Sequence, residues 1–257
     1  MSANVGLALA LTTIAGLSTG IGGAIAFFIK KPKAVYLSLS LGFSGGVMLY
    51  ISFVALLPNG INGVGELWGI SAFFIGIIFI GIIDMLIPET KNPHEYKVLS
   101  EFEVGQLDKT LMRAGGLTAL AIGIHNFPEG LATFGTAISD LKLGVLITIA
   151  IAIHNIPEGI SVSIPIYCAT GNRKKAFIYS LIAGIAEPVG AVIGFLILMP
   201  FLSAGLLAGL LAFVAGIMVY ISVDEILPMA HRYGHGHIVI MGMILGMFII
   251  ALSLLML

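Results

Sequence analysis

Two hexapeptides in this sequence contain the residue types that bind metal ions. The first reads HNFPEG at residues 125–130, and a near copy, HNIPEG, occupies residues 154–159. In each copy the histidine and the glutamate are four positions apart, so a helix places both on one face, with the asparagine one step round. Imidazole, amide and carboxylate groups at this spacing form a ligand set for a divalent cation.

Both hexapeptides lie inside long apolar runs, and so does a third polar element, Glu187, which is followed by a proline. Polar side chains at such a depth in a membrane usually face the interior of a helix bundle and mark a pathway or a proton relay. Mixed nitrogen and oxygen donors suit zinc and neighbouring first-row metals, whereas calcium and magnesium prefer oxygen alone. The candidate ligands are His125, Asn126, Glu129, His154, Asn155, Glu158 and Glu187.

Several other residues are compatible with more than one role. Met48 and Met218 occur in matching sequence contexts, and their spacing alone favours packing, because methionine fills irregular gaps. Asp224 and Glu225, near the end of the seventh apolar run, fit solvated end charges and an exit path equally well. A short histidine tract is interpreted as a solvated loop rather than a metal-receiving segment, and its members are His231, His235 and His237.

The composition indicates a membrane protein. Of the 257 residues, 58% are hydrophobic and only 10% are charged, whereas about a quarter of the residues in a soluble domain are charged. Apolar runs of about twenty residues or more predict an all-α polytopic membrane protein. The net charge of −1 gives no electrostatic basis for binding nucleic acid, and the single Cys168 allows no internal disulfide. We expect no prosthetic group.

We predict eight transmembrane helices in a single transporter domain that comprises residues 1–257. No basic segment or small-residue cleavage site accompanies the first apolar run, so we expect a retained span rather than a signal peptide. The only long polar segment, residues 89–108, is predicted to be a cytoplasmic loop. The predicted spans cover about residues 5–29, 34–57, 66–87, 111–138, 143–168, 175–199, 203–227 and 237–257.

The basic residues predict the orientation of these spans. In the eight-span topology, every lysine and arginine except Lys142 falls on the same side of the membrane. Because short cytoplasmic loops are enriched in basic residues, we expect this side to be cytoplasmic and both termini to be extracytoplasmic. The short chain with its tight loops favours a prokaryotic inner membrane.

Two internal repeats predict a symmetric architecture. Residues 46–58 resemble residues 216–228, and these segments fall on the second and seventh spans. The two hexapeptides fall on the fourth and fifth spans. Both pairs cross the membrane in opposite directions, so both fit one pseudo-two-fold axis in the membrane plane. Inverted repeats around a midplane site are typical of transporters, and the prolines in the hexapeptides fit kinked helices around a polar cavity.

The eight apolar runs, the paired hexapeptides and the glutamate in the sixth run resemble the ZIP family of divalent metal transporters, and most of all its compact bacterial members. The resemblance covers essentially the whole chain. It implies a three-two-three arrangement of helices, in which helices one, four, five and six move as a bundle against helices two, three, seven and eight. It also implies alternating access and a homodimer.

The resemblance further implies a binuclear metal site midway across the membrane. One metal position takes the histidines and glutamates of both hexapeptides, with Met48 as a further ligand, because residues 46–48 match the family's Gly-x-Met pattern. The other position takes Glu187 and the two asparagines, and it shares Glu129 and Glu158 with the first.

We therefore expect a carrier that moves Zn²⁺, and with it Fe²⁺, Mn²⁺, Co²⁺ or Cd²⁺, into the cytoplasm. An intramembrane metal-dependent hydrolase is a rival interpretation, but the sequence has no HExxH motif, and a symmetric duplication suits a carrier better than an asymmetric reaction site. A proton-coupled exporter built on the same residues stays open. The expected partners are divalent metal ions, the lipid bilayer and a second copy of the chain.

Overall fold

A computed structural model of the chain describes residues 2–25, 28, 33–86, 109–198, 201, 203–233 and 235–255. Within these ranges some helical side chains, including that of His125, are outside the description. The predicted cytoplasmic loop at residues 89–108 also lies outside the described residues.

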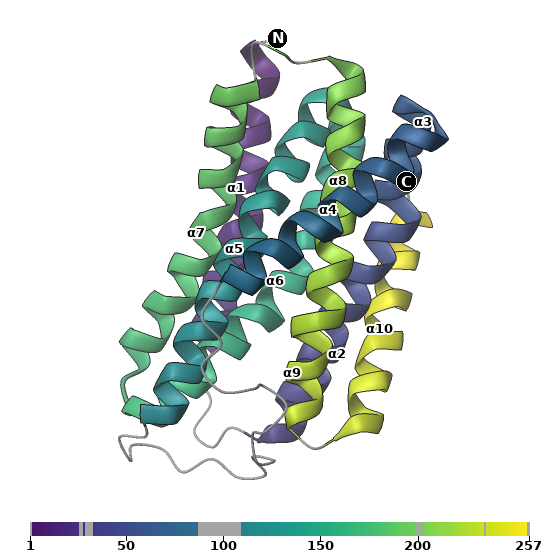
Figure 1. The fold of residues 1–257 in the computed structure, drawn as a ribbon. Coiled ribbons are helices and arrows are strands. Elements are labelled where there is room, and N and C mark those ends of the chain that lie inside the picture. Colours follow the sequence, from purple (N-terminus) through teal and green to yellow (C-terminus); the bar gives the residue numbers. More distant parts are fainter. Residues whose placement is uncertain are drawn as a thin grey trace.

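The described chain runs through eight continuous helices (Figure 1). Two of these helices, the second and the seventh, contain a π-helical turn between two α-helical parts. This arrangement confirms the predicted all-α, eight-helix fold. The elements are α1 (Ser2–Ile25), α2 (Ala34–Ile51) with η1 (Ser52–Leu56) and α3 (Leu57–Val64), α4 (Glu66–Leu86), α5 (Lys109–Ser139), α6 (Leu141–Thr170), α7 (Arg173–Leu198), α8 (Ala204–Ile221) with η4 (Ser222–Ile226) and α9 (Leu227–Arg232), and α10 (Gly236–Leu255).

Large apolar side chains cover the outside of these helices as well as the inside. Examples are Ile14 on α1, Phe74 and Ile78 on α4, and Ile244 and Phe248 on α10, all of them exposed. Among the described residues, seven helices are long and apolar enough to cross a membrane, and α5, which carries the first polar hexapeptide, is not one of the seven. An apolar exterior over long helices is the surface that lipid requires, so the chain is a multi-pass membrane protein.

The second and seventh helices continue beyond the ends that we predicted for them at residues 57 and 227, each of which is followed by a proline. The second runs through Pro58 to Val64, and the seventh runs through Pro228 to Arg232. In each case a π-helical turn comes first, and the proline stands in the first turn of the next α-helix. The π-helical turn interrupts the regular α-helical hydrogen-bond pattern just before each proline, so the helix can accommodate a residue that has no N–H.

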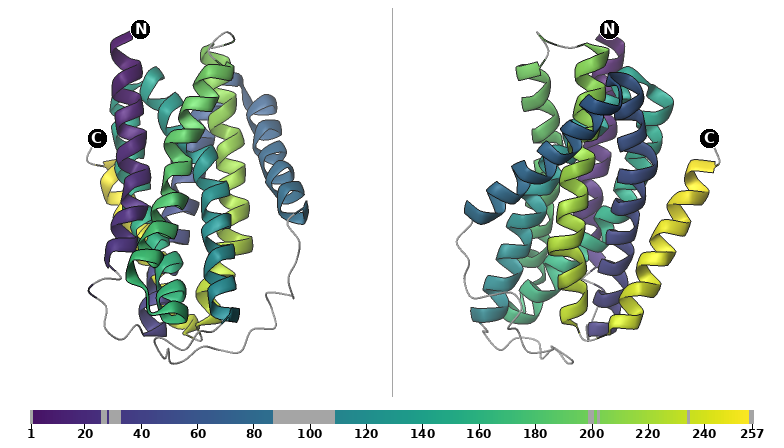
Figure 2. Two further views of the ribbon diagram at one scale, coloured as in Figure 1. Left: turned by 90° about the vertical axis from the view of Figure 1, so that its left-hand side faces the viewer. Right: turned by 45° about the vertical axis from the view of Figure 1, so that its right-hand side comes forward.

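The helices pack in two groups that are related by the predicted repeat. One group consists of α1, α5, α6 and α7, and the other of α2–α3, α4, α8–α9 and α10 (Figures 1 and 2). Each pairing has its counterpart, since α1 packs on α6 as α7 packs on α5, and α2 packs on α10 as α8 packs on α4. The groups meet where α2 contacts α6 and where α8 contacts α5. The packing therefore follows a pseudo-two-fold relation.

The glycines that end the two hexapeptides bring neighbouring backbones very close together. A Cβ atom on Gly130 of α5 would lie 1.8 Å from the backbone oxygen of Glu187 on α7. A Cβ atom on Gly159 of α6 would lie 1.9 Å from the backbone oxygen of Thr19 on α1. No side chain fits at these distances, so glycine is required wherever these helices touch at the level of the hexapeptides.

We expect Gly130→Ala to lower the free energy of unfolding by about 1–3 kcal/mol, because α5 and α7 must separate to admit the methyl group. Thermal unfolding of the purified protein in detergent measures the loss. Gly116→Ala on the same helix is the matched control, since nothing lies within 4 Å of a Cβ atom there. Equal melting temperatures for the two variants would show that the close approach does not constrain the fold.

Candidate metal centre

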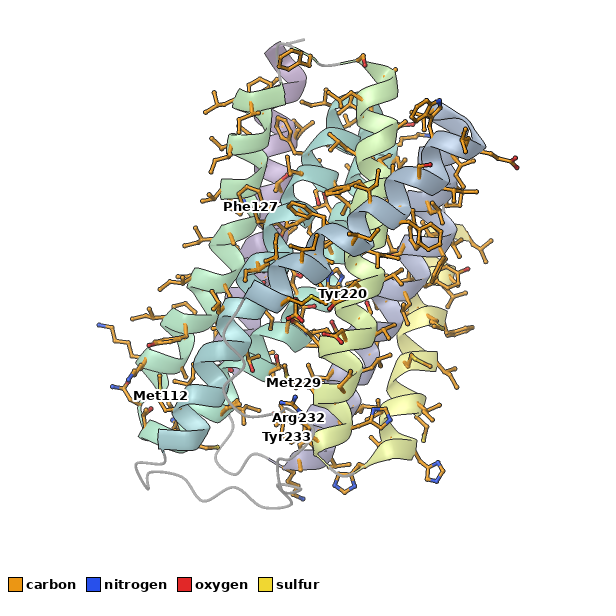
Figure 3. The ribbon with its side chains drawn as sticks, viewed as in Figure 1. Met112, Phe127, Tyr220, Met229, Arg232 and Tyr233 are labelled. Carbon is orange, nitrogen blue, oxygen red and sulfur yellow. The ribbon has the colours of Figure 1, made fainter. Side chains whose placement is uncertain are left out.

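The described polar side chains of the two hexapeptides lie in the interior of the helix bundle. Phe127, inside the first hexapeptide, lies in the middle part of the bundle, whereas Arg232 and Tyr233 lie at one end (Figure 3). Seven predicted ligands have no exposed surface at all: Met48, Asn126, Glu129, His154, Asn155, Glu158 and Glu187. Burying an ionised carboxylate costs about 5 kcal/mol unless hydrogen bonds or a cation compensate it. The partners of these residues therefore decide what the site can hold.

The histidine of the second hexapeptide faces the glutamate of the first. Nε2 of His154 on α6 lies 3.4 Å from Oε1 of Glu129 on α5. Nδ1 of the same imidazole lies 3.2 Å from the backbone oxygen of Ala150. Because a carbonyl only accepts hydrogen bonds, Nδ1 carries the proton in this contact, and Nε2 is the nitrogen directed at the carboxylate. An imidazole held in this way by a backbone oxygen is the usual arrangement of a metal-binding histidine.

The second asparagine links three helices of one packing group. Nδ2 of Asn155 on α6 donates a hydrogen bond of 2.9 Å to Oε2 of Glu187 on α7. The same nitrogen donates a second bond, of 3.1 Å, to the backbone oxygen of Ala15 on α1. The asparagine of the first hexapeptide makes a simpler contact, because among the described residues Nδ2 of Asn126 donates to the backbone oxygen of Ala183 alone, at 3.0 Å. Both amide groups thus use their nitrogen on the protein and keep their oxygen available.

Several buried oxygens have no hydrogen-bond partner among the described residues. One is the hydroxyl oxygen of Thr19, and the other five are Oδ1 of Asn126, Oδ1 of Asn155, Oε1 of Glu187 and both carboxylate oxygens of Glu129. Unsatisfied buried polar atoms are rare and costly, so a cluster of them indicates a missing ligand. These five atoms are acceptors, and a cation, a proton or a bound donor such as water can satisfy them.

The described side chains form pairs, and they do not form a closed metal cage. No group of three His, Cys, Asp or Glu side chains is close enough to hold a metal ion among the residues that the structure describes. The pairs are His154 with Glu129, Asn155 with Glu187, and Ser44 with Glu158. Carboxylates repel one another unless a cation lies between them, so separated pairs are expected for this donor set without an ion. The side chain of His125 is outside the description.

Met48 lies on the helix face that meets this site. Met48 is fully buried, and Ser44, one helical turn earlier on α2, donates a 2.9 Å hydrogen bond to Oε1 of Glu158. Its counterpart on α8, Met218, is also fully buried. The backbone oxygens of both methionines accept hydrogen bonds of 2.7 Å from Ser52 and Ser222 at the start of the π-helical turns. The two methionines, which occur in matching sequence contexts, therefore also make matching backbone hydrogen bonds.

Sequence reasoning missed two contributors to the site. The first is Ser44, although its spacing of four from Met48 indicates a shared helix face. The second is the backbone of α1, which supplies the oxygen of Ala15 to Asn155 and the oxygen of Thr19 to Ser180. A side-chain pattern contains no signal for a backbone acceptor, so only the packing of α1 reveals this role.

Asp224 and Glu225 belong to the π-helical turn η4, inside the seventh helix and not at its end. Asp224 is exposed and Glu225 is half-buried. Nδ1 of His231 lies 2.8 Å from the backbone oxygen of Leu227, and His231, His235 and His237 are exposed, as expected for a solvated segment.

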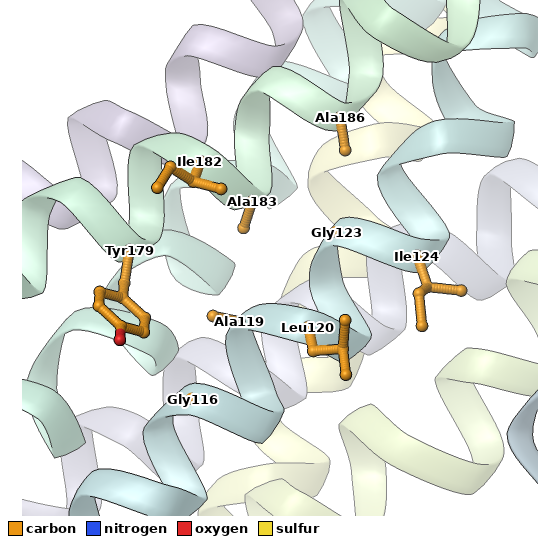
Figure 4. Close-up of a pocket in the computed structure, with 9 residues that line it drawn as sticks. All are labelled: Gly116, Ala119, Leu120, Gly123, Ile124, Tyr179, Ile182, Ala183 and Ala186. Carbon is orange, nitrogen blue, oxygen red and sulfur yellow. The ribbon is translucent and has the colours of Figure 1, made fainter. Parts of the chain in front are cut away.

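An apolar hollow of about 450 Å³ lies between α5 and α7 (Figure 4). Its wall includes the small residues Gly116, Gly123 and Ala183 together with Tyr179 and Ile182. The described residues that line it include no carboxylate, imidazole or amide side chain. These apolar walls offer no ligand to a hydrated cation.

We expect Asn155→Ala to destabilise the metal-free protein by about 1–3 kcal/mol, because a buried carboxylate loses its donor. Asn126→Ala removes only a bond to a backbone oxygen, so its cost is expected to be smaller, at about 1 kcal/mol. Chemical or thermal unfolding in the presence of a chelator compares the two variants. A larger loss for Asn126→Ala than for Asn155→Ala would contradict this description of the site.

Comparison with known proteins gives the same assignment along the whole chain. Residues 87–254 match the family described as the ZIP zinc transporter. The chain is 51% identical to the zinc transporter ZupT of Streptococcus mutans, over 100% of this chain and 99% of that protein. It is 54% identical to ZupT of Chlorobium phaeovibrioides over 97% of both chains, and 51% identical to ZupT of Lysinibacillus sphaericus over 100% of both. With this coverage, and with a buried donor set on opposed helices, the chain belongs to the ZIP family of transporters and is not an enzyme.

Proposed function

We propose that this protein carries Zn²⁺ across the membrane into the cytoplasm. The observation that carries the proposal is the set of buried oxygens on α5, α6 and α7 that have no hydrogen-bond partner among the described residues. These acceptors occur beside an imidazole whose Nε2 is directed at Glu129. Nitrogen with oxygen is a donor mixture that zinc binds well, and the full-length relatives are named zinc transporters.

Within this proposal, two metal positions share the hexapeptide glutamates. The first position takes His125, Glu129, His154 and Glu158 with Met48, and it is supported by the approach of His154 to Glu129. The second takes Asn126, Asn155 and Glu187 with the same two glutamates. The hydrogen bond between Asn155 and Glu187 supports it, because it already places two of these ligands side by side.

A carrier must expose its site alternately to the two sides of the membrane. The division of the helices into two packing groups supports such a movement, since the groups contact each other mainly through α2 with α6 and α8 with α5. The six hexapeptide ligands and Glu187 all lie on α5, α6 and α7, so they would travel together. Only Met48 and Ser44 belong to the other group.

The proposed metal range is Zn²⁺ together with Fe²⁺, Mn²⁺, Co²⁺ and Cd²⁺, because none of the ligands is a thiolate that would select strongly for one soft ion. The proposed orientation places both termini outside the cytoplasm. The start of α1 and the end of α10 lie toward the same end of the bundle (Figures 1 and 2), and the basic start of α7 lies at the opposite end. We also propose that the protein forms a homodimer.

We expect Glu129→Ala and Glu158→Ala to abolish Zn²⁺ uptake, because each glutamate serves both metal positions. Uptake of ⁶⁵Zn²⁺ into proteoliposomes containing equal amounts of each protein measures the effect. Glu66→Ala is the matched control, since this exposed carboxylate stands at the start of α4, outside the site, and uptake should be normal. Wild-type rates in both hexapeptide variants would refute the assignment, and absence of uptake by the wild-type protein would refute the function.

We expect His154→Asn to shift the preference from Zn²⁺ towards Mn²⁺, because an oxygen donor replaces a nitrogen donor and manganese is the harder ion. Competition between the two ions for uptake measures the ratio of their kcat/KM values. His231→Asn changes an exposed histidine in the same way and should leave the ratio unaltered. An equal shift in both variants would argue against a ligand role for His154.

A further inference from the structure

The hydrogen bond between Ser44 and Glu158 connects the two packing groups. Ser44 lies on α2, and its Oγ donates at 2.9 Å to Oε1 of Glu158 on α6. Both side chains are fully buried. The bond lies where α2 packs on α6, one of the two main contacts between the groups. One group thus holds a carboxylate that belongs to the other.

The pseudo-two-fold relation has no equivalent of this bond on its other side. The repeat that aligns Gly46 with Gly216 also aligns Ser44 with Val214 on α8, and the hexapeptides align Glu158 with Glu129 on α5. The counterpart of the serine is therefore an aliphatic residue that cannot donate a hydrogen bond. In agreement, neither oxygen of Glu129 has a hydrogen-bond partner among the described residues. The two hexapeptide glutamates are thus chemically different, although their sequence motifs are nearly identical.

A carboxylate can accept a hydrogen bond and bind a metal ion at the same time, so the bond from Ser44 can affect how Glu158 binds an ion. Two carboxylate oxygens offer about four lone-pair positions, and one hydroxyl takes only one of them. Glu158 can therefore keep its bond to Ser44 while its remaining lone pairs bind a metal. A hydrogen bond to a metal-binding carboxylate fixes its orientation and raises its affinity, and loss of such a partner typically lowers metal affinity by about 10–100-fold.

We propose that Ser44 is a positioning residue that holds Glu158 ready for the ion, and that it does so only while α2 and α6 keep the contact seen here. The proposal rests on the transport function proposed above. When the two groups move past each other, Glu158 leaves the hydroxyl behind and the affinity of the site falls. Binding is then strong in one state of the cycle and weaker in another, as release of the ion requires.

The test is the equilibrium affinity of purified Ser44→Ala protein for Zn²⁺, measured by competition with a zinc-chelating dye. We expect the dissociation constant to rise about 10–100-fold. In proteoliposomes the KM for Zn²⁺ uptake should rise in the same direction, while the rate at saturating Zn²⁺ should be retained or increased, because a weakly held ion is released sooner. If the role of the serine were purely structural, Ser44→Ala would lower the saturating rate and the yield of folded protein, and the KM would not rise while the saturating rate is retained.

Ser38→Ala is the matched control. Ser38 is another fully buried serine on α2, but its Oγ donates at 3.1 Å to the backbone oxygen of Ala230, inside the same packing group. This variant should bind and transport Zn²⁺ as the wild type does. A second pair of variants, Ser44→Thr and Ser44→Val, has nearly the same shape and differs in the hydroxyl group. Of the two, the threonine variant should bind Zn²⁺ more tightly.

The outcomes separate this inference from the function on which it rests. If the wild-type protein transports Zn²⁺ and Ser44→Ala has an unchanged dissociation constant and KM, the role of Ser44 is refuted and the transport function stands. Equal affinities for the threonine and valine variants would refute it in the same way, even if Ser44→Ala did not fold. A lowered saturating rate with unchanged affinity would also overturn it. Absence of transport by the wild type would refute the function itself.

Discussion

The constraint on which this structure depends is the burial of three carboxylates in the interior of a membrane bundle. Glu129, Glu158 and Glu187 have no exposed surface, and each charged carboxylate in a low-dielectric interior needs donors or a cation. The protein supplies some of this compensation, since Ser44 donates to Glu158 and Asn155 donates to Glu187. Both oxygens of Glu129 and Oε1 of Glu187 have no hydrogen-bond partner among the described residues. The compensation by the described side chains is therefore incomplete, and this is the basis of the proposed metal site.

The pseudo-two-fold packing surrounds the buried carboxylates with two similar sets of helices. The hexapeptides lie on α5 and α6, and each of these helices contacts one member of the second group, α8 or α2. Both contacting helices have a π-helical turn at the same place in the repeat, and such turns are frequent at functional sites. The symmetry is broken where chemistry matters most, because serine stands at one contact and valine at the other. The two halves thus share a backbone arrangement but differ in the side chain that faces the hexapeptide glutamate.

The sequence predicted the fold, and it predicted which polar residues are buried in the bundle, because both depend on local periodicity. Long apolar runs determine the number of helices, and a spacing of four places His154 and Glu158 on one helix face. The prolines were less informative, because the rule that a proline ends a helix takes no account of a π-helical turn before it. Pro58 and Pro228 therefore lie inside continuous helices. The partners of the ligands could not be predicted, since Ser44 and Glu158 are 114 positions apart in the chain.

The glycines explain how such short side chains can compensate the carboxylates at all. An asparagine reaches only a few ångströms from its own backbone, so Asn155 can bond to Glu187 on α7 and to the backbone of α1 only if these helices are very close. Gly159, one turn beyond Asn155, allows the contact with α1, and Gly130, one residue after Glu129, allows the contact between α5 and α7. The final residue of each hexapeptide thus sets the distance at which the others act. For this reason the motif is best understood as one unit, in which the polar side chains make the contacts and the glycine brings the neighbouring helices close enough for these contacts to form.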